Sequence, residues 1–450
     1  MSNVEAKGMA TMGFVRKYLS ADGLHKTVRQ CLRKEKFEEC NRSDYSWQDC
    51  IMSGLAIFGL KFPSLLKFDE RKSDDPILRR NLRNLYGIEQ APSDTTLRER
   101  LDELSPRQLR RSFKQIFSHL QRGKMLERFR YLDGHYIISV DGTGQYSSKE
   151  VSCENCCVKN HRNGEVTYYH HMLGAAVVHP DEKVVIPFAP EPIVKGDGST
   201  KNDCERNASK RLLKDLRKEH PHLKILIVED ALASNHPHLS QLDELKMSYV
   251  IGVKPGDHEY LFDWIKDLKG KEHVEIDDKG NEHQYHYYSE VPLNDANHDY
   301  RVNVIEYREK KASGKTLKFS WVTKITVTPE NVNQLMRAGR SRWKVENETF
   351  NTLKNQGYNF EHNYGHGKKE LCSVMTMLML QAFLIDQVLQ LSCKIYQKAR
   401  KKTAALYALF EEVRVVIRYG VWESWGQLYE RIGWSSEGRA PPPLVTELSN

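Results

Sequence analysis

Apolar positions in the first third of the chain recur with a helical period. The segment WQDCIMSGLAIFGL (47–60) is apolar on nearly every side and contains small residues, which is typical of a buried helix. The segment PSDTTLRERLDEL (92–104) begins with Ser93 or Asp94 as an N-cap, and a helical period follows. We therefore expect residues 1–130 to form a helical region.

From about residue 131 the pattern changes to short apolar runs rich in β-branched residues, which predict strands. These runs cover residues 135–144, 167–180, 183–194, 223–232 and 248–256. The run LKILIVEDAL is uninterrupted, which is typical of a strand buried on both faces. Amphipathic segments that predict helices precede and follow it, at 201–220 and 238–246. The predicted order of elements is three strands, a helix, a strand, a helix and a strand. This order predicts an α/β fold with a mixed sheet over residues 131–256.

Residues 257–328 alternate between polar and apolar positions, with turn signals at DDKG, NDAN and KASGK. This alternation predicts a β-rich insertion, and its expected strands lie at 282–291, 300–309 and 317–327.

Helix is predicted again after the insertion. Thr328 precedes Pro329 at a first helical position, and the helix is expected to continue through RSRWKVENETFNTLKNQG as far as Gly357. The longest apolar stretch, 371–385, is too short and too interrupted to span a bilayer, so we expect a buried helix.

Residues 329–395 thus form a second part of the α/β core. We expect residues 396–450 to be a C-terminal helical region that ends in a loose tail, GRAPPPLVTELSN.

The charge of the chain is uneven. The formal net charge is +8, and residues 1–130 hold 26 basic and 17 acidic side chains. The whole positive excess therefore lies in the helical region, which suggests a polyanion such as DNA as partner. A solvated helical surface with salt bridges is the alternative. No secretory signal or membrane span is predicted, so we expect a cytoplasmic protein with no membrane partner.

Two aspartates follow apolar strands directly. Asp141 comes after IISV and Asp230 after ILIVE. The ends of strands in open α/β sheets are where sites form, and a buried carboxylate requires a cation or hydrogen-bond donors nearby. Two or three converging carboxylates are enough to hold Mg²⁺. The alternative for either residue is a turn-forming aspartate.

A third candidate carboxylate lies on the predicted helix after Ser341. Arg342 and Glu346 are four residues apart and would share one helix face. Glu346 could reach a metal while Arg342 holds a phosphate or orients the carboxylate. The alternative is an ordinary surface ion pair.

Taken together, SVDGTG, IVEDAL, YVIGVKPGD and RWKVENETFNTLK resemble the DDE transposases of bacterial insertion sequences, over roughly residues 135–390. The nearest group is the IS-four-like group, whose last catalytic helix carries a signature of tyrosine, arginine, glutamate and lysine (YREK). The resemblance implies an RNase H-like catalytic core that a β-rich insertion interrupts before the glutamate helix. It also implies that Asp141, Asp230 and Glu346 are the catalytic carboxylates that bind Mg²⁺, with Mn²⁺ as a substitute. Arg342 and Lys354 match the arginine and lysine of the signature.

Two positions depart from that signature. Gly339 stands where the tyrosine is expected, three residues before the arginine. Lys354 lies eight residues after Glu346 instead of seven, which on a regular α-helix would turn it about 80° away rather than about 20°. Glu348 is a competing carboxylate, but it would lie about 120° from Arg342. We therefore prefer Glu346.

The reaction that the resemblance implies is cleavage of DNA at the ends of a transposable element and joining of the 3′-hydroxyl to target DNA. The DNA includes the terminal inverted repeats, and a homodimer on DNA in the bacterial nucleoid is expected. Lys254 would contact DNA, and Trp343 or Trp321 would stack on an unpaired base. Glu205 could supplement the site. The alternatives for these residues are a strand-end turn for Lys254, an ordinary core or surface tryptophan, which the sequence favours, and a surface role for Glu205, which it also favours. The alternatives are an inactive transposase-derived DNA-binding protein and an RNase H-fold nuclease.

A group of cysteines suggests a separate metal site. SCENCCVKNH (152–161) contains Cys153, Cys156, Cys157 and His161, and a C-x-x-C pair suits tetrahedral Zn²⁺. His170 and Cys204 are further possible ligands. We expect such a zinc to be structural, because the magnesium site requires oxygen ligands. Reduced thiols in a loop are the alternative.

Overall fold

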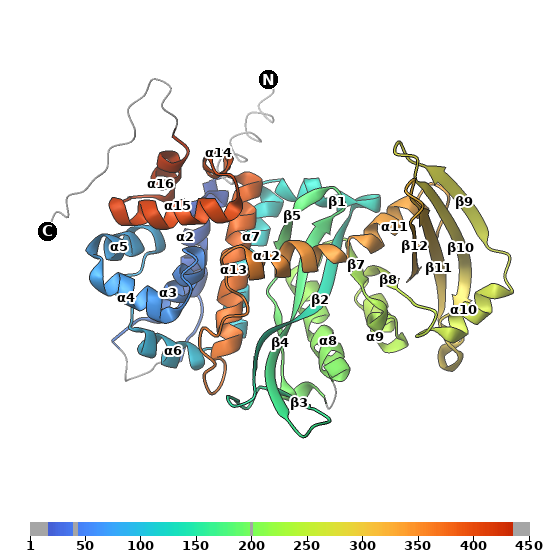
Figure 1. Ribbon diagram of the computed structural model, residues 1–450, viewed down its shortest axis with the longest axis horizontal. Coiled ribbons are helices and arrows are strands. Elements are labelled where there is room, and N and C mark those ends of the chain that lie inside the picture. Colours follow the sequence, from blue (N-terminus) through green and yellow to red (C-terminus); the bar gives the residue numbers. More distant parts are fainter. Residues whose placement is uncertain (1–16, 39–43, 199–200, 435–450) are drawn as a thin grey trace.

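The computed structural model describes residues 17–38, 44–198 and 201–434. Three parts follow one another along its long axis: a group of helices, a sheet covered by helices, and a β-rich end (Figure 1). The predicted tail at 438–450 lies outside the described residues.

The middle of the molecule is a mixed sheet, which confirms the predicted α/β class. Strand β2 (His135–Ser148) lies at its centre, antiparallel to β4 (Val166–His179) and parallel to β7 (Ile225–Glu229). Strand β8 (Ser248–Gly252) is parallel to β7 on the far side. Four shorter strands extend β2 and β4: β1 (Arg130–Tyr131), β3 (Cys157–Asn160), β5 (Glu182–Pro187) and β6 (Glu191–Ile193). The parallel pairing places the middle of β2 beside the carboxyl end of β7.

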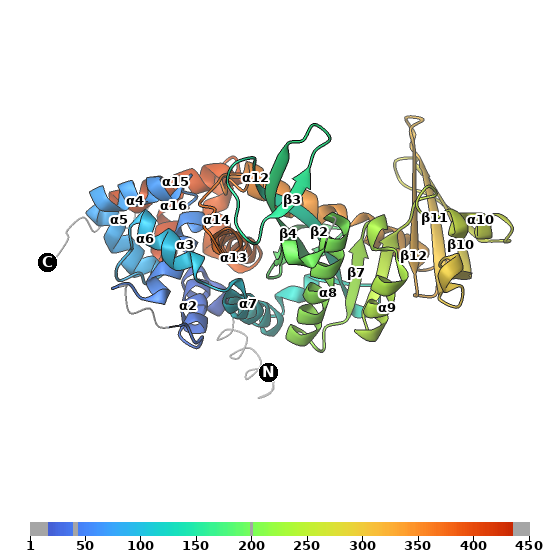
Figure 2. The same cartoon turned by 90° about the horizontal axis from the view of Figure 1, so that it is seen from below.

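Helices cover both faces of this sheet. Helices α8 (Lys201–Glu219) and α9 (His236–Glu244) connect the parallel strands and pack on one face. The other face carries a broken helical segment, made of α11 (Val332–Arg340), the π-helical stretch η9 (Val345–Phe350) and α12 (Asn351–Asn355) (Figure 2). This segment passes over β2 and β4.

The insertion extends the central sheet. Its elements are α10 (Glu259–Lys266), β9 (Lys271–Ile276), β10 (Glu282–Pro292), β11 (Arg301–Lys310) and β12 (Thr316–Thr323). Strand β12 pairs with β8 through Trp321 opposite Gly252 and Val322 opposite Ile251. The β-rich segment therefore uses the open edge of β8 and becomes part of one 12-stranded sheet.

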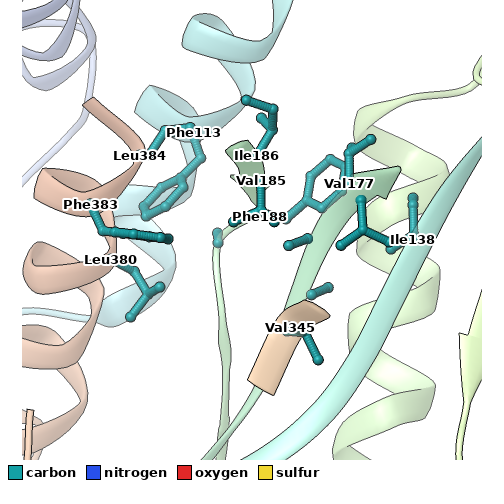
Figure 3. Close-up of a cluster of buried hydrophobic side chains, with 14 of the residues drawn as sticks. Phe113, Ile138, Val177, Val185, Ile186, Phe188, Val345, Leu380, Phe383 and Leu384 are labelled. Carbon is teal, nitrogen blue, oxygen red and sulfur yellow. The ribbon is translucent and has the colours of Figure 1, made fainter. Parts of the chain in front are cut away.

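A long buried helix, α13 (Leu371–Ser392), joins the sheet to the helical end. By length and composition it could cross a membrane, but 94% of its most apolar window is buried inside the molecule, as the sequence predicted. Phe383 and Leu384 on α13 face Phe113, Val185 and the strand residues behind them (Figure 3). One continuous core therefore connects helices and sheet.

The helical part of the molecule is built from N-terminal and C-terminal segments of the described chain. It contains α2 (Ala21–Leu32), α3 (Trp47–Gly59), α4 (Leu65–Asp74), α5 (Pro76–Asn81), η2 (Leu82–Tyr86), α6 (Asp94–Asp102), α7 (Arg110–Arg122), α14 (Lys394–Lys402), α15 (Leu406–Tyr419) and α16 (Trp425–Ile432). Helix α3 packs closely on α13, because a Cβ on Gly54 would lie 2.6 Å from a Leu378 methyl carbon. The C-terminal helices pack against α2 and α5. The predicted domain boundaries stay a prediction.

Asn81 connects the two ends of the chain, and its loss is expected to destabilise the helical end. The fully buried amide donates to the carbonyl oxygens of Ile417 (2.6 Å) and Gly420 (2.7 Å) and accepts from the Trp422 amide (2.7 Å). Asn81→Ala should lower the free energy of unfolding by about 2–4 kcal/mol, because it leaves buried backbone groups without partners. Denaturant unfolding would measure this. Asn84→Ala is the control, since Asn84 makes one part-buried bond to Trp422 and should cost about 1 kcal/mol. Equal losses in the two variants would contradict the expectation.

Candidate active site

Asp141 and Asp230 lie beside each other on the adjacent parallel strands β2 and β7. Only Asp230 directly follows the end of its strand, because β2 continues past Asp141 to Ser148. The prediction that a strand ends at Asp141 is therefore wrong. Ser139 on β2 is paired with Val228 on β7, so each aspartate stands two residues beyond that pair. The Asp141 carboxylate accepts a hydrogen bond from the Gly142 amide at 2.8 Å, and that of Asp230 accepts one from the Leu232 amide at 3.0 Å. Asp230 therefore forms a local turn, as the alternative proposed, whereas Asp141 lies within β2, and the two residues meet at one site.

The segment that carries Arg342 and Glu346 is not the continuous α-helix that the sequence predicted. Helix α11 ends at Arg340, a turn contains Ser341 and Arg342, and the chain then enters η9. The turn is held against β2, because the buried Ser139 hydroxyl donates to the carbonyl oxygen of Arg342 at 2.7 Å. Sequence analysis missed this role of Ser139, which has no signal beyond its position two residues before Asp141.

The Arg342 guanidinium pairs with the Asp141 carboxylate. The distance from Arg342 Nη1 to Asp141 Oδ2 is 3.1 Å, and the two side chains are 14% and 28% exposed. The predicted alternative, an isolated surface ion pair between Arg342 and Glu346, is therefore wrong, because Arg342 faces β2. The arginine spans the gap between the sheet and the glutamate segment.

Three carboxylates interact electrostatically at this place. Burial raises the pKa of Asp141 from 3.8 to about 6; Arg342 and the Gly142 amide oppose this shift, and the charges of Asp230 and Glu346 add to it. Glu346 is thus close enough to affect Asp141. Compensation of the charge on Asp141 is incomplete, which is the condition under which a cation binds favourably.

The π-helical stretch changes the expected position of Lys354. A π turn closes on the fifth residue rather than the fourth, so it accommodates one more residue per turn than an α-helix. The seven residues between Glu346 and Lys354 span the remainder of η9 and the start of α12, so the extra residue does not produce the rotation of a regular α-helix. Lys354 Nζ pairs with Glu361 at 3.0 Å.

A cavity of about 620 Å³ opens beside Asp230, between the Arg342 turn and the insertion. Its lining includes five cations: Lys254, Arg308, Lys318, Arg340 and Arg342. The predicted contact residue Lys254 therefore lies near the carboxylates. The excess of positive charge suits a polyanion.

Two tryptophans line the same cavity in different ways. Trp321 is 5% exposed, and a Cβ on Gly339 would lie 2.5 Å from its indole nitrogen. Any larger residue at Gly339, the position of the signature tyrosine, would therefore collide with Trp321. Trp343 is 46% exposed, and the Arg342 guanidinium lies 4.0 Å from its ring centroid. Trp343 is thus the more accessible of the two rings.

A second, smaller pocket of about 70 Å³ lies on the α8 side of the aspartates. Asp141, Asp230 and Glu205 line it, and a Cβ on Gly142 would be 3.1 Å from Glu205 Oε1. The weaker candidate Glu205 is therefore part of the surroundings of the two aspartates.

The cysteine-rich loop forms a cluster that differs from the predicted one. Cys153 and Cys156 meet His170 on β4 and His366 in the loop before α13. Cys157 lies elsewhere, because it is the first residue of β3 and its sulfur faces the Ile193 carbonyl oxygen at 3.8 Å. His161 is also outside the cluster and its Nε2 lies 2.8 Å from the Thr167 hydroxyl. His366 was missed because it is about 200 residues distant in sequence.

The model of one protein family, described as Transposase DDE domain, matches residues 133–380. This range is slightly more than half of the chain and contains Asp141, Asp230 and Glu346. No match is found among curated proteins.

Burial of Asp141 should destabilise the metal-free fold above pH 6. A folded pKa of about 6 against an ordinary value of 3.8 means that the folded state retains the proton longer, so stability falls as pH rises through this window. Asp141→Asn removes this titration and should raise the free energy of unfolding by roughly 1–2 kcal/mol at pH 7.5 in magnesium-free buffer. The gain should shrink towards pH 5. Denaturant unfolding at both pH values measures it, and a less stable variant at pH 7.5 would contradict the expectation.

Proposed function

The chain belongs to the family of transposase DDE domains, and on this basis we propose that it cleaves DNA at the ends of a transposable element and joins the freed 3′-hydroxyl to target DNA. The observation that carries the proposal is the convergence of Asp141, Asp230 and Glu346. They come from two strands and a helical segment that are far apart in sequence.

We further propose that the middle of the molecule is an RNase H-like core. In support, the antiparallel strands β5, β4 and β2 are followed by the parallel strands β7 and β8, with the glutamate segment across one face. The β-rich insertion between β8 and α11 precedes that segment. Membership of the IS-four-like group rests on Arg342, Glu346 and Lys354.

The carboxylates suit a hard divalent cation. Asp141, Asp230 and Glu346 offer oxygen ligands of the kind that Mg²⁺ or Mn²⁺ takes. The pKa of Asp141, which burial raises and the charges of Asp230 and Glu346 raise further, supports this proposal. These three residues would hold the metal. When bound, it would lower the pKa of a water or 3′-hydroxyl and stabilise charge on the phosphate.

The neighbouring cations would position the DNA. Arg342, held beside Asp141 by Ser139, lies where a scissile phosphate would approach the carboxylates. Lys254 and Arg340 would contact phosphates in the cavity, and Trp343 would stack on an unpaired base. Lys354, which matches the lysine of the signature, would contact a phosphate near the scissile bond. We propose that the basic helical region binds the terminal inverted repeats, as a homodimer on DNA in the cytoplasm.

Strand cleavage of a duplex that carries the gene's own flanking ends, with Mg²⁺, tests the proposal. Asp141→Asn and Glu346→Gln should each lower the cleavage rate by roughly 10³-fold or more, because the carboxylates act as one unit. Glu348→Gln is the matched control and should keep the rate within about threefold of wild type. DNA binding, measured by gel shift, should persist in all three variants.

Other outcomes would assign a different function. Binding without cleavage in either Mg²⁺ or Mn²⁺ would identify an inactive DNA-binding relative. Cleavage indifferent to the end sequence would identify a nuclease. Loss of cleavage in Glu348→Gln with activity kept in Glu346→Gln would reverse the choice of glutamate.

Trp343 provides a separate test of DNA-end recognition. Trp343→Ala should lower cleavage by roughly 5- to 100-fold, the size of one lost base–aromatic stack, whereas Trp343→Phe should retain most of the rate. Trp264→Ala is the control, because Trp264 is comparably exposed (37%) but lies on α10. Equal effects of Trp343→Ala and Trp264→Ala would contradict a stacking role.

A further inference from the structure

Two thiols and two imidazoles converge where the β2–β3 loop, strand β4 and the loop before α13 meet. Cys153 and Cys156 come from the loop between β2 and β3, His170 from β4, and His366 from the loop between α12 and α13. One potential ligand atom from each residue lies within 4.8 Å of all the others. Cys156, His170 and His366 are 1%, 2% and 6% exposed, so the cluster is largely shielded from water.

The spacing of the four atoms is that of a tetrahedral zinc site. Zinc bonds of about 2.3 Å to sulfur and about 2.0–2.1 Å to nitrogen give tetrahedral edges of about 3.8 Å between sulfurs, 3.5 Å between sulfur and nitrogen, and 3.3 Å between nitrogens. The two sulfurs are 3.8 Å apart. The sulfur–nitrogen distances are 3.3 and 3.4 Å to His170 and 3.2 Å from Cys156 to His366. The two Nε2 atoms are 3.2 Å apart.

Hydrogen bonding alone does not account for this arrangement. An imidazole Nε2 has one hydrogen or one lone pair in the ring plane, so it serves a single partner along one direction. His170 Nε2 nevertheless has three partners at 3.2 to 3.4 Å, and these also approach one another. A cation at the common centre would accept one lone pair from each of the four atoms.

The surroundings set the protonation that a metal requires. Nδ1 of His366 lies 2.9 Å from the Gly367 carbonyl oxygen, which can only accept, so this nitrogen carries the hydrogen. Nε2 of the neutral ring then presents its lone pair to the cluster, as in known metal sites. The Cys153 amide also donates a hydrogen bond to the Cys156 sulfur, at 3.5 Å.

We propose that Cys153, Cys156, His170 and His366 bind a structural zinc ion. Two thiolates and two imidazoles in tetrahedral spacing select zinc over magnesium, and four protein ligands leave no position open for a substrate. This set retains Cys153, Cys156 and His170 from the predicted ligands, and His366 takes a place that had been expected for Cys157, His161 or Cys204. The proposal is independent of the DNA reaction.

The zinc ion would connect the sheet to the helical end. His366 lies five residues before the start of α13, and its ring packs 4.8 Å from that of Tyr146 on β2. Next to it, Asn155 donates to the Lys369 carbonyl oxygen at 3.0 Å, and the Asp102 carboxylate of α6 accepts from the Lys369 and Leu371 amides. Metal binding would therefore contribute folding free energy where α6, α13 and the β2–β3 loop meet.

Metal analysis of the full chain, purified without chelator, tests the proposal. Wild type should contain about one zinc per chain, and Cys156→Ser and His366→Asn should each lose most of it. Cys157→Ser and His161→Asn are matched controls, because they change neighbouring residues of the same types outside the cluster, and both should keep the zinc. Chelation should lower the thermal midpoint of wild type and of the two controls, with much less effect on the two ligand variants.

Cobalt reconstitution keeps the test valid if a ligand variant does not fold. Co²⁺ in the wild-type protein should show the intense visible bands of tetrahedral coordination together with thiolate-to-metal charge transfer. Octahedral spectra without sulfur bands, or a disulfide between Cys153 and Cys156 in zinc-free protein, would overturn the proposal. Zinc retained in His366→Asn and lost in His161→Asn would overturn the ligand set.

Discussion

The pairing of β2 with β7 is the constraint on which the candidate site depends. Because the two strands are parallel and in register from Tyr136 to Ser139, Asp141 within β2 lies beside Asp230, which directly follows the end of β7. Both strands are buried along this part, so a shift by one residue would reverse their inward and outward side chains and separate the carboxylates. The geometry of two catalytic candidates therefore follows from ordinary sheet packing.

The third carboxylate depends on an interruption in a helix. The hydrogen bond from Ser139 to the Arg342 carbonyl joins the turn to β2, and the π-helical stretch then carries Glu346 close enough to affect Asp141. π turns occur often at functional sites, where a regular helix would direct side chains elsewhere. A buried carboxylate destabilises the metal-free fold, and the surrounding core holds it in place. Such a conflict between local stability and site chemistry is typical of active sites.

The helical end and the sheet behave as one packed body because α13 belongs to both. Its buried length contacts α3 and α6 on one side and β5 on the other. The proposed zinc lies near its first turn, and the buried Lys61–Asp386 pair (2.8 Å) lies further along it.

The sequence alone determined the elements and the candidate chemistry, because apolar periodicity, caps and strand-end aspartates are local signals. It predicted the mixed α/β sheet, the buried helix at 371–385 and the two aspartates, whereas the choice of Glu346 over Glu348 stays a prediction. Only the tertiary structure decided the break at Ser341, the pairing of Arg342 with Asp141 and the replacement of His161 by His366. These depend on contacts between segments about 200 residues apart, and such contacts leave no periodic pattern in either segment.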